Sequence, residues 1–139
     1  MGILADIFIS RDEEAVGYDS NPNLPPSDRM EAKRITPLEL STLWAITSGK
    51  RWDISFMKEF KCIFEKDSGE RLIHRVPAAM VQDLMNLAPG RIQTVASVWA
   101  NTEEMNWPVD NACNFIEEVV SLAQRASESG RNVYVWNCV

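Results

Sequence analysis

The C-terminal end of the chain constrains the fold more than any other segment. An amphipathic run from Val109 to Ser129 ends at Gly130, and residues 132–139 are rich in β-branched and aromatic side chains. This order predicts a long helix, a glycine stop and a terminal strand. Such a strand must be paired or buried, because an open apolar edge aggregates. Residues 3–10 alternate as a strand does, so we expect the two ends of the chain to pair within one sheet.

The length of the chain fits a single globular domain that spans residues 1–139. A domain of this size buries roughly 70% of the surface that its unfolded chain exposes, so it needs no disulfide or metal for stability. We expect about five helices and two or three short strands, which is a helix-dominated α+β domain with helices packed on a small sheet that includes both termini. Both faces of residues 3–10 carry apolar side chains, so this strand should lie centrally or be covered on both sides.

Residues 11–34 differ from the rest of the chain. They begin with the charge run Asp12-Glu13-Glu14, and residues 21–28 have the asparagine and proline content of turns and polyproline segments. Such a stretch cannot continue a helix or a central strand. We interpret residues 11–34 as an irregular, Pro-rich connection within the domain, while noting that loops of this length are often functional.

The clearest helix signal is the segment Thr36-Pro37-Leu38-Glu39. A threonine cap, a proline at the first helical position and a glutamate three residues after the cap together form a capping box. The apolar stripe that follows predicts a helix that closes at Gly49. Similar stripes predict helices that begin at Pro77, run from Ile92 to about Glu103, and fill residues 109–129.

Residues 54–76 allow two interpretations. A wide apolar face predicts a helix from Ile54 to Glu65, followed by a short strand at Arg71–Arg75, and we favour this interpretation. The rival interpretation pairs residues 61–66 with residues 70–76 as a hairpin around the turn Asp67-Ser68-Gly69. Periodicity alone settles neither this choice nor the order of the strands.

The charge balance disfavours several classes of partner. The chain has 20 acidic and 14 basic residues, which gives a net charge of −6, and no segment is strongly basic. A phosphate-rich partner would be repelled at long range, which argues against binding to nucleic acid or to an anionic membrane. Lys50, Arg51, Arg71 and Arg75 could still gather into one basic patch when the chain folds.

Neither a membrane span nor a secretory leader is predicted. No apolar run reaches the roughly 20 residues that cross a bilayer, and Asp6 interrupts the apolar run near the N-terminus. The cysteines Cys62, Cys113 and Cys138 are far apart and lack C-x-x-C spacing, which indicates reduced, buried thiols and neither disulfides nor a zinc site. We therefore expect a cytoplasmic protein.

Several short segments of the chain occur in an order that is also typical of a known protein family. They are Met1-Gly2-Ile3, Lys50-Arg51-Trp52-Asp53 before a helix, Val76-Pro77-Ala78-Ala79-Met80-Val81 with Leu84, and Ala126-Ser127-Glu128-Ser129-Gly130 before a strand with Val133, Val135 and Trp136. This order resembles the YfbM-like family of small bacterial proteins. The resemblance implies an α+β fold and a cytoplasmic location. That family has no assigned function, so no catalytic residue carries over, and residues 20–28 and 99–104 depart from its pattern.

The sequence carries no catalytic, metal or phosphate motif. His74 is the only histidine, so any Ser–His–acid triad would have to use it, and the chain has no G-x-S-x-G elbow. His74 could also activate the Cys62 thiol, but the sequence spacing of the two residues gives no reason to expect contact between them. On a strand, His74 would share a face with Leu72 and Val76, where a lone histidine is usually a core residue. The glycines are isolated, so no phosphate loop exists, and we predict neither a cofactor nor a metal site.

The five tryptophans are the least ordinary feature for this length. Trp44 and Trp99 lie on helical stripes and should be core residues, whereas Trp136 lies in the last strand. Trp52 and Trp107 lie beside turns, where an indole is often half exposed and suits an interface or a ligand cleft. Our candidate binding residues are Trp52, Asp53, His74, Arg75, Glu103, Glu104 and Trp107.

Two functions compete on this basis. Acidity, tryptophan beside turns and the lack of a catalytic signature favour a protein-interaction module, such as an immunity-type or regulatory adaptor with a basic protein partner. The alternative is a small-ligand binder or enzyme with a cleft near His74, Arg75 and Trp52, because a histidine beside an arginine at a strand end is a common site. An exposed sheet edge could support a homodimer, but no pattern commits the chain to one.

Overall fold

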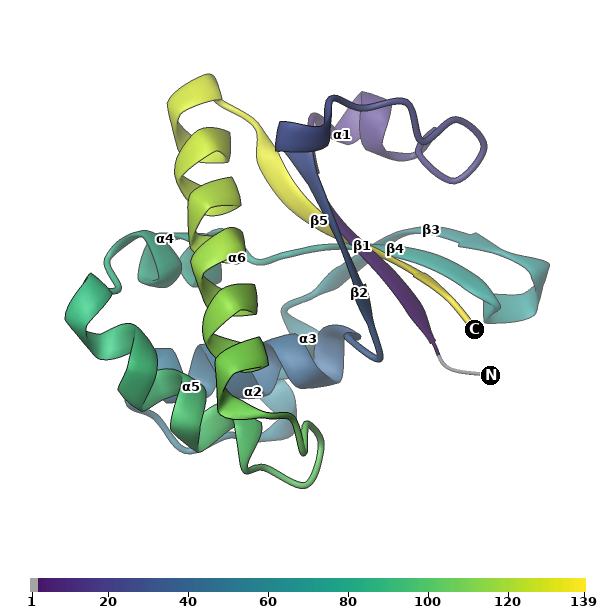
Figure 1. Cartoon of the computed structure of the whole chain (residues 1–139). Helices are drawn as coiled ribbons and strands as arrows, with labels where there is room; N and C mark the ends of the chain where they lie inside the picture. The colour runs from purple at the N-terminus through teal and green to yellow at the C-terminus, as the bar shows by residue number, and fades with distance from the viewer. Residues whose placement is uncertain (1–2) are drawn as a thin grey trace.

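The computed structural model describes residues 3–139 and shows one α+β domain (Figure 1). Its antiparallel sheet has the strand order β2-β1-β5-β4-β3. The strands are β1 (Leu4–Ser10), β2 (Arg29–Lys33), β3 (Lys61–Lys66), β4 (Arg71–Arg75) and β5 (Asn132–Cys138). The helices are α1 (Asp12–Ala15), α2 (Pro37–Thr47), α3 (Ile54–Lys58), α4 (Ala78–Met85), α5 (Ile92–Ala100) and α6 (Val109–Ser129). The predicted fold class is confirmed, although the sheet has more strands than expected.

The two ends of the chain lie side by side at the centre of the sheet, as predicted. β1 pairs with β5 along its whole length, from Leu4 opposite Cys138 to Ser10 opposite Asn132. β1 also pairs with β2, and β5 also pairs with β4, so both terminal strands are internal to the sheet. Burial of β1 on both faces is likewise confirmed, because Ile7 on one face and Phe8 on the other are fully buried.

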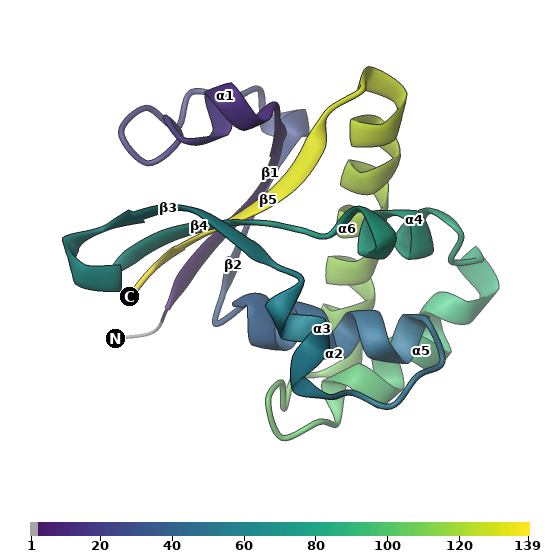
Figure 2. The same cartoon turned by 180° about the vertical axis from the view of Figure 1, so that it is seen from behind.

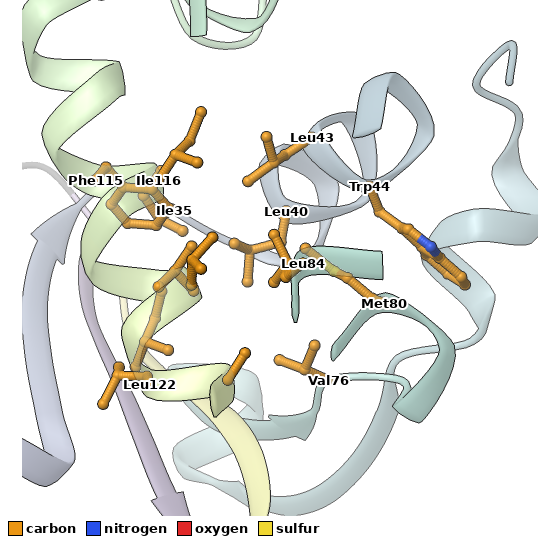
Figure 3. Close-up of a cluster of buried hydrophobic side chains, with 14 of the residues drawn as sticks. Ile35, Leu40, Leu43, Trp44, Val76, Met80, Leu84, Phe115, Ile116 and Leu122 are labelled. Carbon is orange, nitrogen blue, oxygen red and sulfur yellow. The ribbon is translucent and has the colours of Figure 1, made fainter. Parts of the chain in front are cut away.

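The helices other than α1 lie on one side of the sheet (Figures 1 and 2). α6 contacts β1, β2 and β5, while α4 and α5 pack against α6, and α2 packs against α4 and α5. Figure 3 shows side chains from α2, α4 and α6 meeting in one apolar centre, with Leu40, Leu84 and Ile116 among them. This main core orients α6 along the sheet, with its polar side facing outward.

Local signals act as predicted at two helix ends. The Thr36 hydroxyl oxygen accepts a hydrogen bond from Leu38 N at 3.3 Å, and Glu39 Oε1 accepts one from Thr36 N at 2.7 Å, which completes the capping box of α2. Gly130 ends α6 with a φ of 66°, in the left-handed region that favours glycine. The turn at Gly130 directs the chain from α6 into β5.

The prediction of a helix from Ile54 to Glu65 is wrong after its first turns. α3 ends at Lys58, and residues 61–66 form β3, which pairs with β4. The rival hairpin interpretation is therefore the correct one, and the expected strand at Arg71–Arg75 is confirmed.

The physical reason for the hairpin lies in its turn and its burial. Asp67, Ser68 and Gly69 all adopt positive φ, which allows the tight reversal between β3 and β4. Phe64 lies opposite Ile73 and packs on the sheet face away from the main core. Periodicity cannot reveal this, because the stabilisation of β3 comes from its pairing with β4.

The segment 11–34 is more ordered than the irregular connection that we expected. It contains α1, one turn of 3-10 helix at Pro26–Asp28, and the edge strand β2. Residues 12–28, which include α1, close the sheet face that the other helices leave open (Figure 2). They do so through an outer cluster that consists of Phe8, Ala15, Tyr18, Ile73 and Tyr134, with Leu24, Ile63, Phe64 and Trp136 at its margin.

Aromatic stacking and hydrogen bonds hold this segment on the sheet. Tyr18 stacks on Phe8 with ring centroids 4.0 Å apart, and its hydroxyl donates to Asp6 Oδ2 at 2.7 Å. Burial and the Asp6 carboxylate raise the pKa of Tyr18, so the phenol stays protonated and remains a donor. Trp136 Nε1 donates to Asp19 Oδ1 at 2.8 Å.

Asp28 joins three elements of the fold. Its Oδ1 accepts a hydrogen bond from Arg125 of α6 at 2.7 Å, and its Oδ2 accepts one from Arg131 at 2.9 Å. The bond from Arg131, supported by Arg125, holds the pKa of Asp28 below its usual 3.8. Asp28 thus ties the start of β2 to α6 and to the start of β5.

Replacing Asp28 with Asn should lower the free energy of unfolding by about 1–3 kcal/mol at neutral pH, because the carboxylate charge and one of the two acceptor oxygens that face the arginines are lost. The folded carboxylate has a depressed pKa, so its stabilisation is complete above the unfolded value of 3.8 and is lost as the pH falls from that value through the lower folded pKa. The difference between the two proteins should therefore shrink below about pH 4 in urea denaturation. Glu117→Gln, which changes an exposed carboxylate of α6, is the control, and equal stability of Asp28→Asn and the wild type at neutral pH would contradict the assignment.

Candidate functional site

The seven candidate binding residues come from three different parts of the chain. Trp52 and Asp53 precede α3, whereas His74 and Arg75 end β4. Glu103, Glu104 and Trp107 lie in the connection between α5 and α6. Among these residues, Trp107 lines a hollow of the protein surface.

Trp52 and Asp53 both serve the local structure at the start of α3. Trp52 Nε1 donates a hydrogen bond to Ser41 Oγ of α2 at 2.9 Å. Asp53 caps α3, because its Oδ1 accepts from Ser55 N at 2.7 Å and also from the Ser55 hydroxyl. These bonds lower the pKa of Asp53. The polar groups of both residues are therefore engaged within the fold.

His74 lies on the sheet face toward the main core, opposite Val135 of β5. Its Nδ1 is buried and has no hydrogen-bond partner among residues 3–139. Burial lowers the pKa of the imidazole, which is therefore neutral at pH 7. The hairpin places Cys62 directly across from His74, a proximity that the sequence spacing did not predict. The Cys62 thiol donates to the Phe64 carbonyl oxygen at 3.4 Å.

The expectation of buried cysteines is wrong. Cys62 is exposed, and Cys113 and Cys138 are partly exposed, although all three are free thiols. Cys62 is exposed because β3 is an edge strand of the sheet. Residues 3–139 bring no three His, Cys, Asp or Glu side chains together as ligands for a metal ion.

Arg75 points to the other face of the sheet. Its Nη1 lies 3.0 Å from Asp12 Oδ2, and Asp12 also accepts a hydrogen bond from the Tyr134 hydroxyl. Burial, reinforced by Asp12, raises the pKa of Tyr134 to about 12. Arg71 pairs with Asp67 at 2.7 Å. Arg71 and Arg75, two of the four residues of the expected basic patch, are thus each paired with an aspartate.

Most of the tryptophans use their indole N–H within the fold. Trp44 and Trp99 are core residues, as predicted, and donate to Asp83 Oδ2 at 2.9 Å and to the Glu39 carbonyl oxygen at 3.0 Å. Trp107 differs, because its N–H has no acceptor within residues 3–139 of the structure. Its half-exposed ring packs against the ring of Trp99, with centroids 5.9 Å apart.

Trp107 lines a hollow of about 250 Å³ between the edge strand β2 and the helix α6. The floor of the hollow is apolar and contains the buried side chains of Met30 and Phe115. Its rim carries exposed polar side chains of α6. We call this hollow the β2–α6 groove, lined by Met30, Glu31, Ala32, Trp107, Asn111, Asn114, Phe115 and Glu118.

Sequence reasoning missed the polar rim of this groove. Asn111, Asn114 and Glu118 recur at intervals of three and four residues, so they form one stripe on α6. The sequence could have revealed this polar stripe, but the stripe forms the rim of a groove only if another element lies opposite α6. The opposite wall is β2, which lies within the segment 11–34 that we interpreted as irregular.

The outer edge of β2 leaves backbone groups unpaired. Arg34 N donates to Ile3 O at 2.7 Å, and hydrogen bonding alternates along an antiparallel pair, so residues 30 and 32 also bond to β1. The N–H and C=O groups of Arg29, Glu31 and Lys33 therefore point away from the sheet. β2 is the outermost strand on its side, and no other strand in residues 3–139 pairs with this edge.

The two faces of β2 differ in chemistry. On the helix side, Met30 and Ala32 face the β2–α6 groove. On the other side, a hollow of about 350 Å³ is lined by Asp6, Trp136 and the charged side chains of β2. Arg29 and Glu31 form an ion pair there at 2.9 Å. The edge is therefore flanked on one side by a groove with an apolar floor and a polar rim, and on the other side by a charged hollow.

Comparison with known proteins gives no functional lead, because no protein-family model, curated protein or solved structure matches the chain. No helix within residues 3–139 combines the length and the apolar character that crossing a bilayer demands.

Replacing His74 with Leu should make the protein less sensitive to acid. Because burial lowers the folded pKa below the unfolded value of 6.5, the wild-type fold loses stability as the pH falls below 6.5. We expect the urea midpoint of the wild type to fall more than that of His74→Leu between about pH 7.5 and pH 5.5. Glu117→Gln should follow the wild type. Parallel pH profiles for His74→Leu and the wild type would show that the imidazole is not held neutral by burial.

Proposed function

We propose that the protein is a protein-interaction module, of the immunity-type or regulatory-adaptor kind, whose partner docks in the β2–α6 groove. The observation that carries the proposal is Trp107, a half-exposed indole with an unused N–H that lines a groove beside an unpaired strand edge. Tryptophan is among the residues that dominate binding energy at protein interfaces, because it combines a large apolar surface with one donor.

The groove is built on elements that binding need not reorganise. Trp107 packs against Trp99 and Phe115, both of which are buried in the main core. The polar rim stands on α6, whose opposite side is anchored on the sheet. A preformed surface of this kind loses little conformational entropy when a partner binds.

The negative charge of the chain supports a basic protein as its partner. The carboxylate on the rim of the groove is that of Glu118, whereas Glu31 pairs with Arg29 on the opposite face of the sheet, and the whole chain carries a net charge of −6. Complementary charge accelerates association and selects against acidic competitors. The same charge disfavours nucleic acid and anionic membranes as partners.

A cytoplasmic location belongs to this proposal. The three cysteines are free, and Cys62 is exposed at the edge strand β3. A free, exposed thiol is compatible with a reducing compartment, whereas oxidising compartments favour disulfides. The resemblance to the YfbM-like family implies the same location.

The alternative function, a ligand or catalytic site near His74, Arg75 and Trp52, draws support from one observation. His74 Nδ1 is buried without a hydrogen-bond partner, as a group awaiting a ligand would be. Against it, His74 and Arg75 are consecutive on β4 and point to opposite faces of the sheet. Trp52 donates its N–H to Ser41. We therefore favour the interaction module.

A pair of neighbouring charge reversals tests the proposal. Glu118→Lys changes the rim of the groove, whereas Glu117→Lys makes the same change about 100° around α6, outside the groove. Affinity capture from the source cells should recover one stoichiometric protein with the wild type and with Glu117→Lys. We expect recovery with Glu118→Lys to fall at least about tenfold, because the reversed charge repels a basic partner.

Two results would contradict the proposal. One is a partner that binds the wild type and both variants equally, which would place the interface elsewhere. The other is the recovery of no protein together with a small molecule that co-purifies with the chain.

A further inference from the structure

We infer that the partner binds as an extended segment that adds a strand to the sheet along β2 and places a lysine or arginine side chain in the β2–α6 groove. This inference rests on the proposed function and specifies the chemistry of the partner. It follows from the backbone of the edge, from the shape of the groove and from the distribution of charge.

The backbone supplies the first argument. Arg29, Glu31 and Lys33 point their N–H and C=O groups outward, at the two-residue spacing with which an added strand makes its hydrogen bonds. Successive side chains of an added strand point to opposite faces. Alternate side chains would therefore enter the β2–α6 groove, and the others would lie over the charged hollow on the opposite face.

The groove fits a long cationic side chain. Its volume of about 250 Å³ is smaller than the roughly 300–1,000 Å³ typical of small-molecule pockets. Met30 and Trp107 offer apolar surface to the aliphatic stem of a lysine or arginine. Glu118 on the rim can accept a charge-assisted hydrogen bond from its head group, and the Trp107 ring can make a cation–π contact.

The distribution of charge favours a different protein over a second copy of this chain. If the β2 edges of two copies of this chain paired antiparallel, only one register would pair Arg29, Glu31 and Lys33 of one copy with the same three residues of the other. It places Glu31 opposite Glu31, and Arg29 opposite Lys33. Like charges directly opposite each other destabilise a strand pair. A basic segment of another protein meets no such repulsion at Glu118.

Two substitutions at one position separate the backbone from the side chain. Glu31→Pro removes the outward N–H at the middle of the edge and leaves the bonds of residues 30 and 32 to β1 in place. Glu31→Ala removes the carboxylate and keeps the N–H. Thermal melting identifies whether each variant is folded. If Glu31→Pro melts far below the wild type, Lys33→Pro makes the same test at the end of the edge.

The probe is a displayed library of random decapeptides selected on the wild-type protein. We expect enriched sequences to alternate with a period of two and to carry lysine or arginine at one of the alternate positions. Their affinity should fall at least about tenfold for Glu31→Pro and Glu118→Lys, and should change less than about threefold for Glu31→Ala and Glu117→Lys.

Several results would overturn strand addition. They are the absence of enriched peptides, enrichment without a basic residue, equal binding to Glu31→Pro and the wild type, and a wild-type dimer that Glu31→Pro converts to a monomer. Affinity capture of the cellular partner with Glu31→Pro shows whether strand addition alone is wrong or whether the proposed function is wrong as well. A partner lost with Glu118→Lys and retained by Glu31→Pro refutes strand addition alone. Peptide binding without any Glu118-dependent partner refutes the proposed function alone.

Discussion

The pairing of β1 with β5 is the contact on which every other part of the structure depends. It brings the two ends of a 139-residue chain together, at a cost in chain entropy that grows slowly with loop length. Burial of Ile7, Ile9, Val133 and Val135 opposes that cost, with about 1.5–3 kcal/mol for each large apolar side chain. β2 attaches to β1, and β4 attaches to β5, so the whole sheet is assembled on this pair. The turn at Gly130 then fixes where α6 lies on the sheet.

The two faces of that central pair are covered in different ways, and this difference creates the candidate interface. Helices cover one face, and residues 12–28 cover the other through Tyr18 and the outer cluster. The same segment leads into β2, whose start is held by the two arginine contacts of Asp28. The segment that covers the second face therefore also places the edge strand β2 beside α6. The β2–α6 groove is a consequence of how the sheet is closed.

Most polar side-chain groups of the tryptophans already form hydrogen bonds within the fold. The indole N–H groups of Trp44, Trp52, Trp99 and Trp136 all donate to acceptors within the chain, so these residues act as structural anchors. Trp107 is only partly buried, its N–H has no acceptor among residues 3–139, and it lines the β2–α6 groove together with residues of the edge strand β2. Partly satisfied groups that converge on one surface are available to a partner, because binding them costs no internal hydrogen bond.

Local chemistry determined much of this fold. The capping box at Thr36, the stop at Gly130 and the alternation of residues 3–10 each depend on atoms a few residues apart, so they could be predicted from the sequence. The pairing of the termini could also be predicted, because two apolar strands at the ends of one chain need each other for burial. The candidate residue Trp107 was recognised for the same reason, since an indole beside a turn is rarely fully buried.

Tertiary structure alone decided the rest. Residues 61–66 form a strand because they pair with β4. Residues 29–33 form an edge strand because they pair with the side of β1 that does not face β5. Cys62 faces His74 only once that hairpin forms. The polar stripe of α6 becomes the rim of a groove only when β2 lies opposite. Each of these outcomes depends on contacts between residues far apart in the sequence, and their contribution to stability leaves no trace in local periodicity.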